Sequence, residues 1–387
     1  MRIAYKWAIA PPVAGLFALA CCFAADNPSR DRPPTAADRD LIVHEWGTFS
    51  TFSGSDGKNL KFYPYDSDLP EFVYGYQKHA KAGPEGGLIS LETPVLYFYS
   101  DHPLTASVQV EFPQGTMTEW YPHAIRTDKK LSWKGIKVLP GEKMKLPTEE
   151  KKSRYYAARE TDATPLRVSL YSKEEGQLTT EQEKFLFYRG VGDFDLPLTV
   201  RAQGGGKFSV SWDCKAPQPQ DDLILVQIDG GKCRFQPFRL TDKGKADVQV
   251  PDADSATDKL GETMVALLTE RGLTEKEARA MVKTWSSAWF GEEGTRVLYL
   301  LPEETTDKLL PLTIDPKPAT LVRVLVGRHD VLTPEKEKQI EGWVAKATRE
   351  GESDAGRQAA SEALAKLGRY RDAAWTEAEA RLQKKKR

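Results

Sequence analysis

Two short segments place glutamate next to histidine and tryptophan, residue types that bind metals, transfer protons or hold ligands. They comprise His44, Glu45 and Trp46 in the first segment and Glu119, Trp120, Tyr121 and His123 in the second. Residues two apart in an extended strand lie on one face, so Glu119, Tyr121 and His123 would point the same way. If the two strands face each other, Glu45 and Glu119 could serve as a catalytic acid–base pair. His44 and His123 could instead bind a divalent metal ion.

The same segments allow two other interpretations. Trp46, Trp120 and Tyr121 could form an aromatic surface that binds a ligand, or each tryptophan could pack inward while its glutamate faces water. The HExxH zinc motif is absent, because Thr48 stands where the second histidine is required. Because glutamate beside histidine has poor specificity as a site signal, inward packing is the favoured alternative.

Two further charged residues border segments that should be buried. Glu92 comes shortly before the apolar run 95–99, and Arg189 follows an aromatic run. Because buried charges need partners, these residues either form a structural ion pair or line a cleft. The ion pair is the favoured alternative, since such pairs usually only specify packing.

The elements that would position these residues are mostly strands up to about residue 146. Residues 95–99 form a continuous apolar and aromatic run, which is typical of a strand buried on both faces. Residues 107–112 alternate between apolar and polar types, which is typical of a half-buried strand. With the turn at 101–103 between them, the two segments are predicted to form a hairpin.

The middle region continues the β pattern with one predicted helix. The Thr-Glu-Gln-Glu motif at 180–183 is a capping box, which predicts the start of a short helix. Three strand-like segments then read as a meander, namely 207–212, 223–228 and 234–238.

After residue 250 the apolar period becomes helical. A helical pair is predicted near 257–290, with a second capping box at 274–277 and a stripe that includes Trp285 and Trp289. We therefore predict a β-rich α+β fold with antiparallel, sandwich-like sheets and this inserted helical pair. The β-rich main domain would span 41–332, and a helical C-terminal extension would span 333–387.

The N-terminal residues 1–24 have the three parts of a signal peptide. A short positive region with Arg2 and Lys6 precedes the apolar run 13–20, and small residues follow it. The run is much shorter than the roughly 20 residues that cross a bilayer, so no transmembrane helix is expected in the mature chain. The sequence therefore predicts an exported protein, either periplasmic or envelope-associated.

The sequence is compatible with two alternative sites of signal-peptide cleavage. The residues before Cys21 are similar to a lipobox, which would make Cys21 the lipid-bearing first residue and give a lipid anchor. The other site follows Ala24 or Ala25. In either case residues 25–40, which contain several prolines, are predicted to be a flexible tether.

The net charge argues against a nucleic-acid partner, and the cysteine content allows one disulfide bond. The formal net charge is −1, and loss of residues 1–20 removes two positive charges and lowers it to −3. Such a chain has no strong positive field to hold a nucleic acid. Cys214 and Cys233 are the cysteines outside the signal region. An oxidising compartment favours a disulfide between them, but the predicted meander places them at opposite ends of a sheet.

Four blocks of sequence are similar to those of a group of uncharacterised exported bacterial proteins. The blocks are HEWGTF from His44, ETPVLYFY from Glu92, TEWYP from Thr118 and EEGTRVLY from Glu292. The resemblance covers about residues 42–335 and implies that this region is one unit. It implies no activity, cofactor or catalytic residue.

Two functions are compatible with these patterns. The first is a non-catalytic envelope protein that binds a glycan, peptide or protein partner on an aromatic-rich surface. The second is a hydrolase that acts on an envelope substrate through the predicted glutamate and histidine cluster, with a divalent metal as one option. The first is favoured, because no segment matches a catalytic motif with a defensible mechanism.

Overall fold

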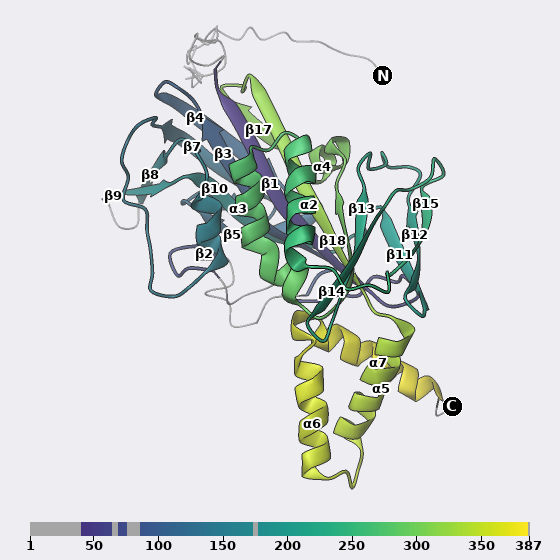
Figure 1. Cartoon of the computed structure of the whole chain (residues 1–387). Helices are drawn as coiled ribbons and strands as arrows, with labels where there is room; N and C mark the ends of the chain where they lie inside the picture. The colour runs from purple at the N-terminus through teal and green to yellow at the C-terminus, as the bar shows by residue number, and fades with distance from the viewer. Residues whose placement is uncertain (1–39, 64–68, 76–85, 173–176, 386–387) are drawn as a thin grey trace, which may run out of the picture. The chain divides into compact units, whose positions relative to one another are not determined.

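The structure is a computed structural model that describes residues 40–63, 69–75, 86–172 and 177–385. The predicted signal peptide, Cys21 and nearly all of the tether lie outside these residues. The described residues form a β-rich α+β fold with mainly antiparallel sheets and a helical C-terminus, as the sequence predicts (Figure 1). Among them, no helix has the length and apolar character needed to cross a membrane.

The largest sheet contains nine strands in the order β14-β13-β16-β18-β1-β3-β10-β5-β2. Its strands are β1 (Ile42–Ser53), β2 (Tyr74–Gly75), β3 (Ile89–Tyr99), β5 (Gly115–Tyr121), β10 (Phe185–Gly192), β13 (Leu223–Asp229), β14 (Lys232–Phe238), β16 (Gly294–Leu300) and β18 (Thr320–Val331). The central pair, β1 and β18, is parallel, whereas the neighbouring pairs are antiparallel. Nearly every residue of β1 is buried, because both faces of this sheet are covered.

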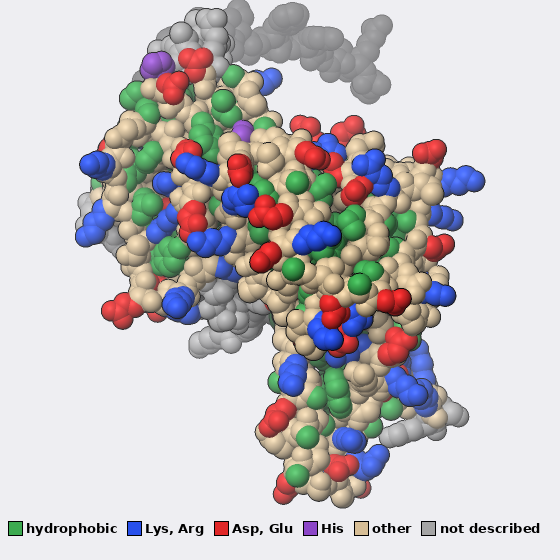
Figure 2. All heavy atoms as spheres, in the orientation of Figure 1, with side chains coloured by type: hydrophobic (Ala, Val, Ile, Leu, Met, Phe, Trp, Pro, Cys, Tyr) green, Lys and Arg blue, Asp and Glu red, His purple; other side chains and the backbone are tan. Residues whose placement is uncertain are grey.

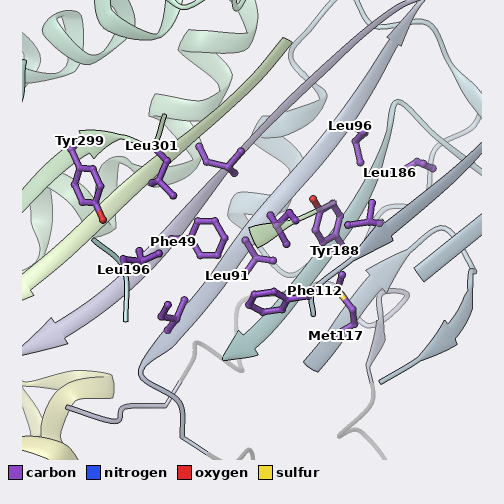
Figure 3. Packing of buried hydrophobic residues seen from close by; sticks show 14 of the residues in the cluster. Phe49, Leu91, Leu96, Phe112, Met117, Leu186, Tyr188, Leu196, Tyr299 and Leu301 are labelled. Carbon is purple, nitrogen blue, oxygen red and sulfur yellow. The ribbon is translucent and has the colours of Figure 1, made fainter. Parts of the chain in front are cut away.

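Two smaller sheets cover one face of the nine-stranded sheet. One has the order β17-β4-β7-β8-β9 with β6 paired to β7, and the other has the order β11-β12-β15. Their strands are β4 (Leu104–Glu111), β6 (Ile125–Thr127), β7 (Lys130–Val138), β8 (Leu166–Ser172), β9 (Gln177–Glu183), β11 (Leu198–Gly204), β12 (Lys207–Trp212), β15 (Lys245–Gln249) and β17 (Leu312–Asp315). One apolar core joins all three sheets, and Figure 3 shows Phe49, Leu91 and Phe112 within it. The sandwich-like arrangement is therefore confirmed.

Helices cover the opposite face. They are α2 (Thr257–Glu270), α3 (Glu275–Ser286), the π-helical turn η3 (Ser287–Gly291) and the 3-10 helix η2 (Arg154–Arg159). The capping box of α3 is formed, since Thr274 and Glu277 each accept a backbone hydrogen bond from the other residue. Trp285 and Trp289 are wholly buried and stack with ring centroids 6.1 Å apart. The predicted helical pair and its apolar stripe are confirmed.

The chain ends in helices that follow the last strand. They are α5 (Pro334–Thr348), α6 (Asp354–Ala365), the 3-10 helix η4 (Gly368–Tyr370) and α7 (Arg371–Lys385), while α4 (Glu303–Leu309) lies earlier, between β16 and β17. A small apolar cluster joins them to the β structure through Phe52, Leu60 and Phe62. On the face drawn in Figure 2, acidic and basic side chains are interspersed, consistent with the near-neutral formal charge.

Three local predictions are wrong. Residues 180–183 belong to strand β9, because Thr180 and Glu181 pair across to β8. The predicted hairpin is not formed, since β3 belongs to the nine-stranded sheet while β4 pairs with β7 and β17. The predicted meander is divided between two sheets, with β12 in the three-stranded sheet and the β13–β14 hairpin in the largest one. Strands β3 and β4 are separated by long-range pairing, whereas residues 180–183 form a local hairpin strand with β8 and β12 forms one with β11.

Candidate functional site

The central strand β1 carries an unusual number of buried polar side chains. His44, Glu45, Thr48, Ser50, Thr51 and Ser53 are each at most 7% exposed. Alternation along the strand sends the odd-numbered residues towards the smaller sheets and the even-numbered residues towards the helices. Because buried polar groups need hydrogen-bond partners, their partners show which of them are structural.

Glu45 faces the smaller sheets and is fully engaged. Its Oε2 accepts a hydrogen bond from Arg323 Nε at 2.6 Å, and its Oε1 accepts one from the hydroxyl of Tyr188. Arg323 also donates to Asp307 at 2.7 Å and to the carbonyl of Leu310 at 2.9 Å. This arrangement has the character of a buried structural ion pair.

Glu119 lies on the other face of the sheet from Glu45. Trp120 is paired with Tyr188, whose side chain points to Glu45, so the neighbouring Glu119 points the opposite way. Strands β3 and β10 separate β5 from β1, which corresponds to roughly 14 Å at the usual strand spacing. The prediction that Glu45 and Glu119 form one acid–base cluster is therefore wrong.

His44 anchors α3 to the sheet. Its Nδ1 lies 2.8 Å from Oε2 of Glu277, whose Oε1 accepts a hydrogen bond from Tyr99 at 2.8 Å. Burial opposes ionisation of Glu277, but its hydrogen bonds, with His44 as the largest contributor, lower its pKa below the ordinary value. Glu277 also completes the capping box of α3, which gives this contact a structural role.

His123 lies in a different environment, just after β5. Its backbone N–H donates to Glu181 Oε2 at 2.5 Å, and its ring contacts Tyr74 at a centroid distance of 4.9 Å. Burial lowers the pKa of His123. His44 and His123 are thus not brought together, and the described residues contain no group of three or more His, Cys, Asp or Glu that could hold a metal ion.

The predicted aromatic surface is mostly core. Trp46 is 0% exposed and Tyr121 is 4% exposed. Trp120 is partly buried, with Tyr74 stacked near it and the guanidinium of Arg126 5.7 Å from its ring centroid. Trp46 and Tyr121 therefore cannot stack on a ligand. Trp46 packs inward as the alternative predicts, but Glu45 beside it is buried in an ion pair and does not face water, so that part of the alternative is wrong.

The two cysteines outside the signal region are free thiols in the structure. Cys214 is exposed beyond the end of β12, whereas Cys233 is buried in β14. Burial raises the pKa of the Cys233 thiol. The structure therefore favours the alternative in which the strands hold these residues apart.

A second set of buried polar residues gathers on the helical face of the sheet. We call it the polar patch, and it consists of Thr48, Ser50, Glu92, Arg189, Arg296, Arg328 and Asp330, none of them more than 5% exposed. The strand register explains their proximity. Thr48 lies opposite Glu92, Ser50 opposite Arg328, and Arg296 opposite Asp330 on adjacent strands.

The backbone is irregular beside the polar patch. The register of β3 shifts against β1 between Trp46 and Thr48, and against β10 between Phe187 and Gly190. Between these shifts Thr93 has a φ of 51°, a left-handed conformation that is rare for a β-branched residue. Bulges and backbone strain of this kind redirect side chains and are common near functional sites.

Close backbone contact accompanies these irregularities. A Cβ atom at Gly47 would lie 2.8 Å from Cα of Pro94, so only glycine fits there. The bulged strands β1 and β3 therefore approach each other more closely than side chains would allow, next to Thr48 and Glu92.

The charges of the polar patch are held fixed. Arg328 donates to Asp330 Oδ2 at 2.6 Å and to Glu292 Oε2 at 2.6 Å. Burial opposes both charges, yet Arg328 and Arg296 hold the pKa of Asp330 well below its usual range, and Asp330 raises the pKa of Arg328. Groups with such pKa values do not change protonation near neutral pH, which suits binding and not proton transfer.

Within the polar patch, Arg296 binds backbone carbonyls of the helical layer. Its guanidinium donates to the carbonyls of Ala288 and Trp289 at 2.8 and 2.9 Å, and to the carbonyl of Glu292 at 2.6 Å. These carbonyls lie at the end of the helical segment that follows α3. Arg296 therefore attaches the helical layer to the sheet beside Asp330.

Several buried side-chain atoms of the polar patch lack a hydrogen-bond partner within the described part of the chain. Among them are Thr48 Oγ1, Ser50 Oγ, Glu92 Oε2 and Arg328 Nη1. Unpaired buried polar atoms are costly, so a group of them on adjacent strands points to an occupant such as a ligand or ordered water.

The sequence predicts only part of this site. It indicates that Glu92 and Arg189 are buried charges that form a structural ion pair or line a cleft. In the structure Glu92 pairs with Arg369 from the C-terminal helices, and Arg189 donates to Thr93 at 3.4 Å. Polar residues inside apolar strands, such as Thr48 and Arg328, were the signal available for the rest.

Comparisons of the chain with protein-family models and with curated proteins found no match. The resemblance to exported bacterial proteins therefore stays a prediction. Three of its four blocks supply residues to the polar patch, namely Thr48, Glu92 and Arg296.

Proposed function

We propose that the chain is an exported, non-catalytic binding protein and that a polar group of its ligand occupies the polar patch. The observation that carries this proposal is the set of four unpartnered atoms on β3, β1 and β18, within the residues that the structure describes. The fold groups these buried atoms beside a strained bulge with their hydrogen-bonding capacity unused, and a ligand group that reached them would satisfy it.

The chemistry of the patch favours a glycan fragment as this ligand. Arg328 Nη1 can only donate, Glu92 Oε2 accepts, and the hydroxyls of Thr48 and Ser50 do both. A sugar presents several neighbouring hydroxyl groups, each of which both donates and accepts. Such a ligand satisfies the whole set, whereas a simple anion would leave the Glu92 oxygen without a donor.

The hydrolase alternative receives no support from the geometry. Its two glutamates lie on opposite faces of the sheet, and Glu45 is held in an ion pair with Arg323. Both carboxylate oxygens of Asp330 in the polar patch accept hydrogen bonds from Arg328, and one also accepts from Tyr370, so this group is engaged within the protein. Binding without chemistry is therefore the function that these residues support best.

Calorimetric titration with a panel of neutral and acidic mono- and oligosaccharides tests the proposal. We expect at least one sugar to bind. Thr48→Val and Ser50→Ala should each raise the Kd for that sugar by up to about tenfold, because each variant loses one hydrogen bond to the ligand. Ser169→Ala is the matched control, because this hydroxyl pairs with Thr180 on β8 and β9, away from the patch. Equal affinities in all three variants would contradict the proposal.

A further inference from the structure

The C-terminal helices reach the polar patch through two neighbouring side chains of η4. Arg369 forms an ion pair with Glu92 Oε1, and the hydroxyl of Tyr370 donates to Asp330 Oδ2 at 2.8 Å. Arg369 also donates to the Tyr370 hydroxyl at 2.9 Å. The ring of Tyr370 stacks on Phe52 with centroids 4.4 Å apart. These contacts form a latch between η4 and the sheet.

The two carboxylate oxygens of Glu92 differ in their hydrogen-bond partners. Its Oε1 is taken by Arg369, while its Oε2 has no partner among the described residues. The latch and a ligand can therefore bind Glu92 together, one on each oxygen. An occupied patch would then hold the latch in place.

Apart from the latch, the C-terminal helices meet the β structure through a small apolar cluster. It joins Phe52, Leu60, Phe62 and Leu332 to the helix residues Ile340, Val344, Leu364, Ala374 and Ala378. Glu337 on α5 accepts hydrogen bonds from the backbone and hydroxyl of Ser55, at 2.8 and 2.7 Å. This cluster is much smaller than the two apolar clusters that hold the sheets and the helical layer, so it stabilises the attachment of the C-terminal helices less.

The connectivity allows these helices to separate from the sheets. Among the described residues, no strand follows Val331, and α5 begins at Pro334. A single short connection therefore links the helices to β18. Moving them breaks no hydrogen bond of any β-ladder.

We propose that residues 334–385 form a lid over the polar patch, latched by Arg369 and Tyr370, which opens as one unit to admit the ligand. This inference rests on the proposed function, because it assigns a regulated entrance to the same site. Closure over a bound sugar keeps Arg369 on one oxygen of Glu92 and the ligand on the other.

Hydrogen exchange of the full mature chain without ligand tests the lid. In the parent protein, amides of α5, α6 and α7 should exchange together and faster than those of β1 and β18. Glu92→Gln weakens the latch and should accelerate exchange of the helices by about tenfold or more, because a hydrogen bond to a charged group is lost. The exchange of β1 and β18 should change far less.

Glu45→Gln is the matched control, since it removes an equally buried charge paired with Arg323 on the opposite face. It should destabilise strands and helices alike. The lid is overturned if the helices exchange no faster than β18 in the parent, or if the two variants produce the same pattern. Because no ligand is present, this result is independent of the sugar titration, which can fail while the lid is confirmed.

Discussion

At the scale of single residues, strand β1 contains two kinds of buried polar side chain. Glu45 has every acceptor oxygen engaged by Arg323 and Tyr188, so it specifies packing. Thr48 and Ser50 on the other face have hydroxyls without partners in the described part of the chain. The difference in hydrogen bonding, and not burial or charge, separates structural residues from candidates for ligand binding.

His329 gives the protein a predictable loss of stability in mild acid. Its ring lies between Thr51 Oγ1 at 2.8 Å and Ser53 Oγ at 2.9 Å, and burial lowers its pKa from 6.5 to about 4. The unfolded chain therefore binds more protons between these pH values. The stabilisation is complete above pH 6.5 and falls by about 3 kcal/mol as the pH drops to 4.

Chemical denaturation at several pH values measures this effect. The control is His329→Gln, which can still hydrogen-bond to Thr51 and Ser53 but does not titrate. The parent should lose more stability than the variant between pH 6.5 and 4. Identical pH profiles would show that His329 does not titrate as its buried position requires.

At the scale of elements, local signals predicted the helices better than the strand pairings. The capping box at Thr274 formed where an apolar helical stripe follows, and Glu277 completes it while also binding His44. The similar motif at Thr180 did not form a helix, since its residues pair with β8 and Glu181 binds Tyr74 and His123. Tertiary pairing overrides a local motif where no apolar helical stripe supports it.

Removal of the Trp285 side chain should test how the helical layer is held. Trp285 is 0% exposed, stacks on Trp289 and lies under the guanidinium of Arg154, 4.3 Å from the ring centroid. We expect Trp285→Ala to lower the free energy of unfolding by about 3–5 kcal/mol in urea denaturation.

Trp375→Ala is a suitable comparison, because Trp375 on α7 is only partly buried. The Trp375→Ala variant should lose much less free energy of unfolding than Trp285→Ala. If Trp285→Ala costs no more than Trp375→Ala, α3 does not pack on the sheet as described.

The candidate site could not be predicted in full because it depends on strand order. Alternation in sequence shows which residues of one strand share a face, but not which strands are neighbours. Ser50 and Arg328 are adjacent only because β1 and β18 pair in parallel across most of the chain. The same limit produced the wrong grouping of Glu45 with Glu119, whose strands share a sheet but are separated by β3 and β10.

At the scale of the whole molecule, the predicted export has a direct test. The N-terminal residues carry the pattern of a signal peptide, and two cleavage sites compete. We expect intact-mass measurement on protein recovered from bacterial cells to show loss of at least residues 1–20. A lipid-modified Cys21 and a plain N-terminus near residue 25 would distinguish the two sites, whereas an uncleaved chain would contradict export.

The central claim is that the polar patch is built for a ligand at some expense of stability, and Thr48→Val tests it most directly. Valine has nearly the same shape as threonine, so the variant exchanges a buried hydroxyl for a methyl group. If the hydroxyl of Thr48 has no partner in the free protein, the free energy of unfolding should rise by about 1 kcal/mol while sugar binding weakens. A fall of similar size would show that the Thr48 hydroxyl already has a structural partner, and would contradict the claim.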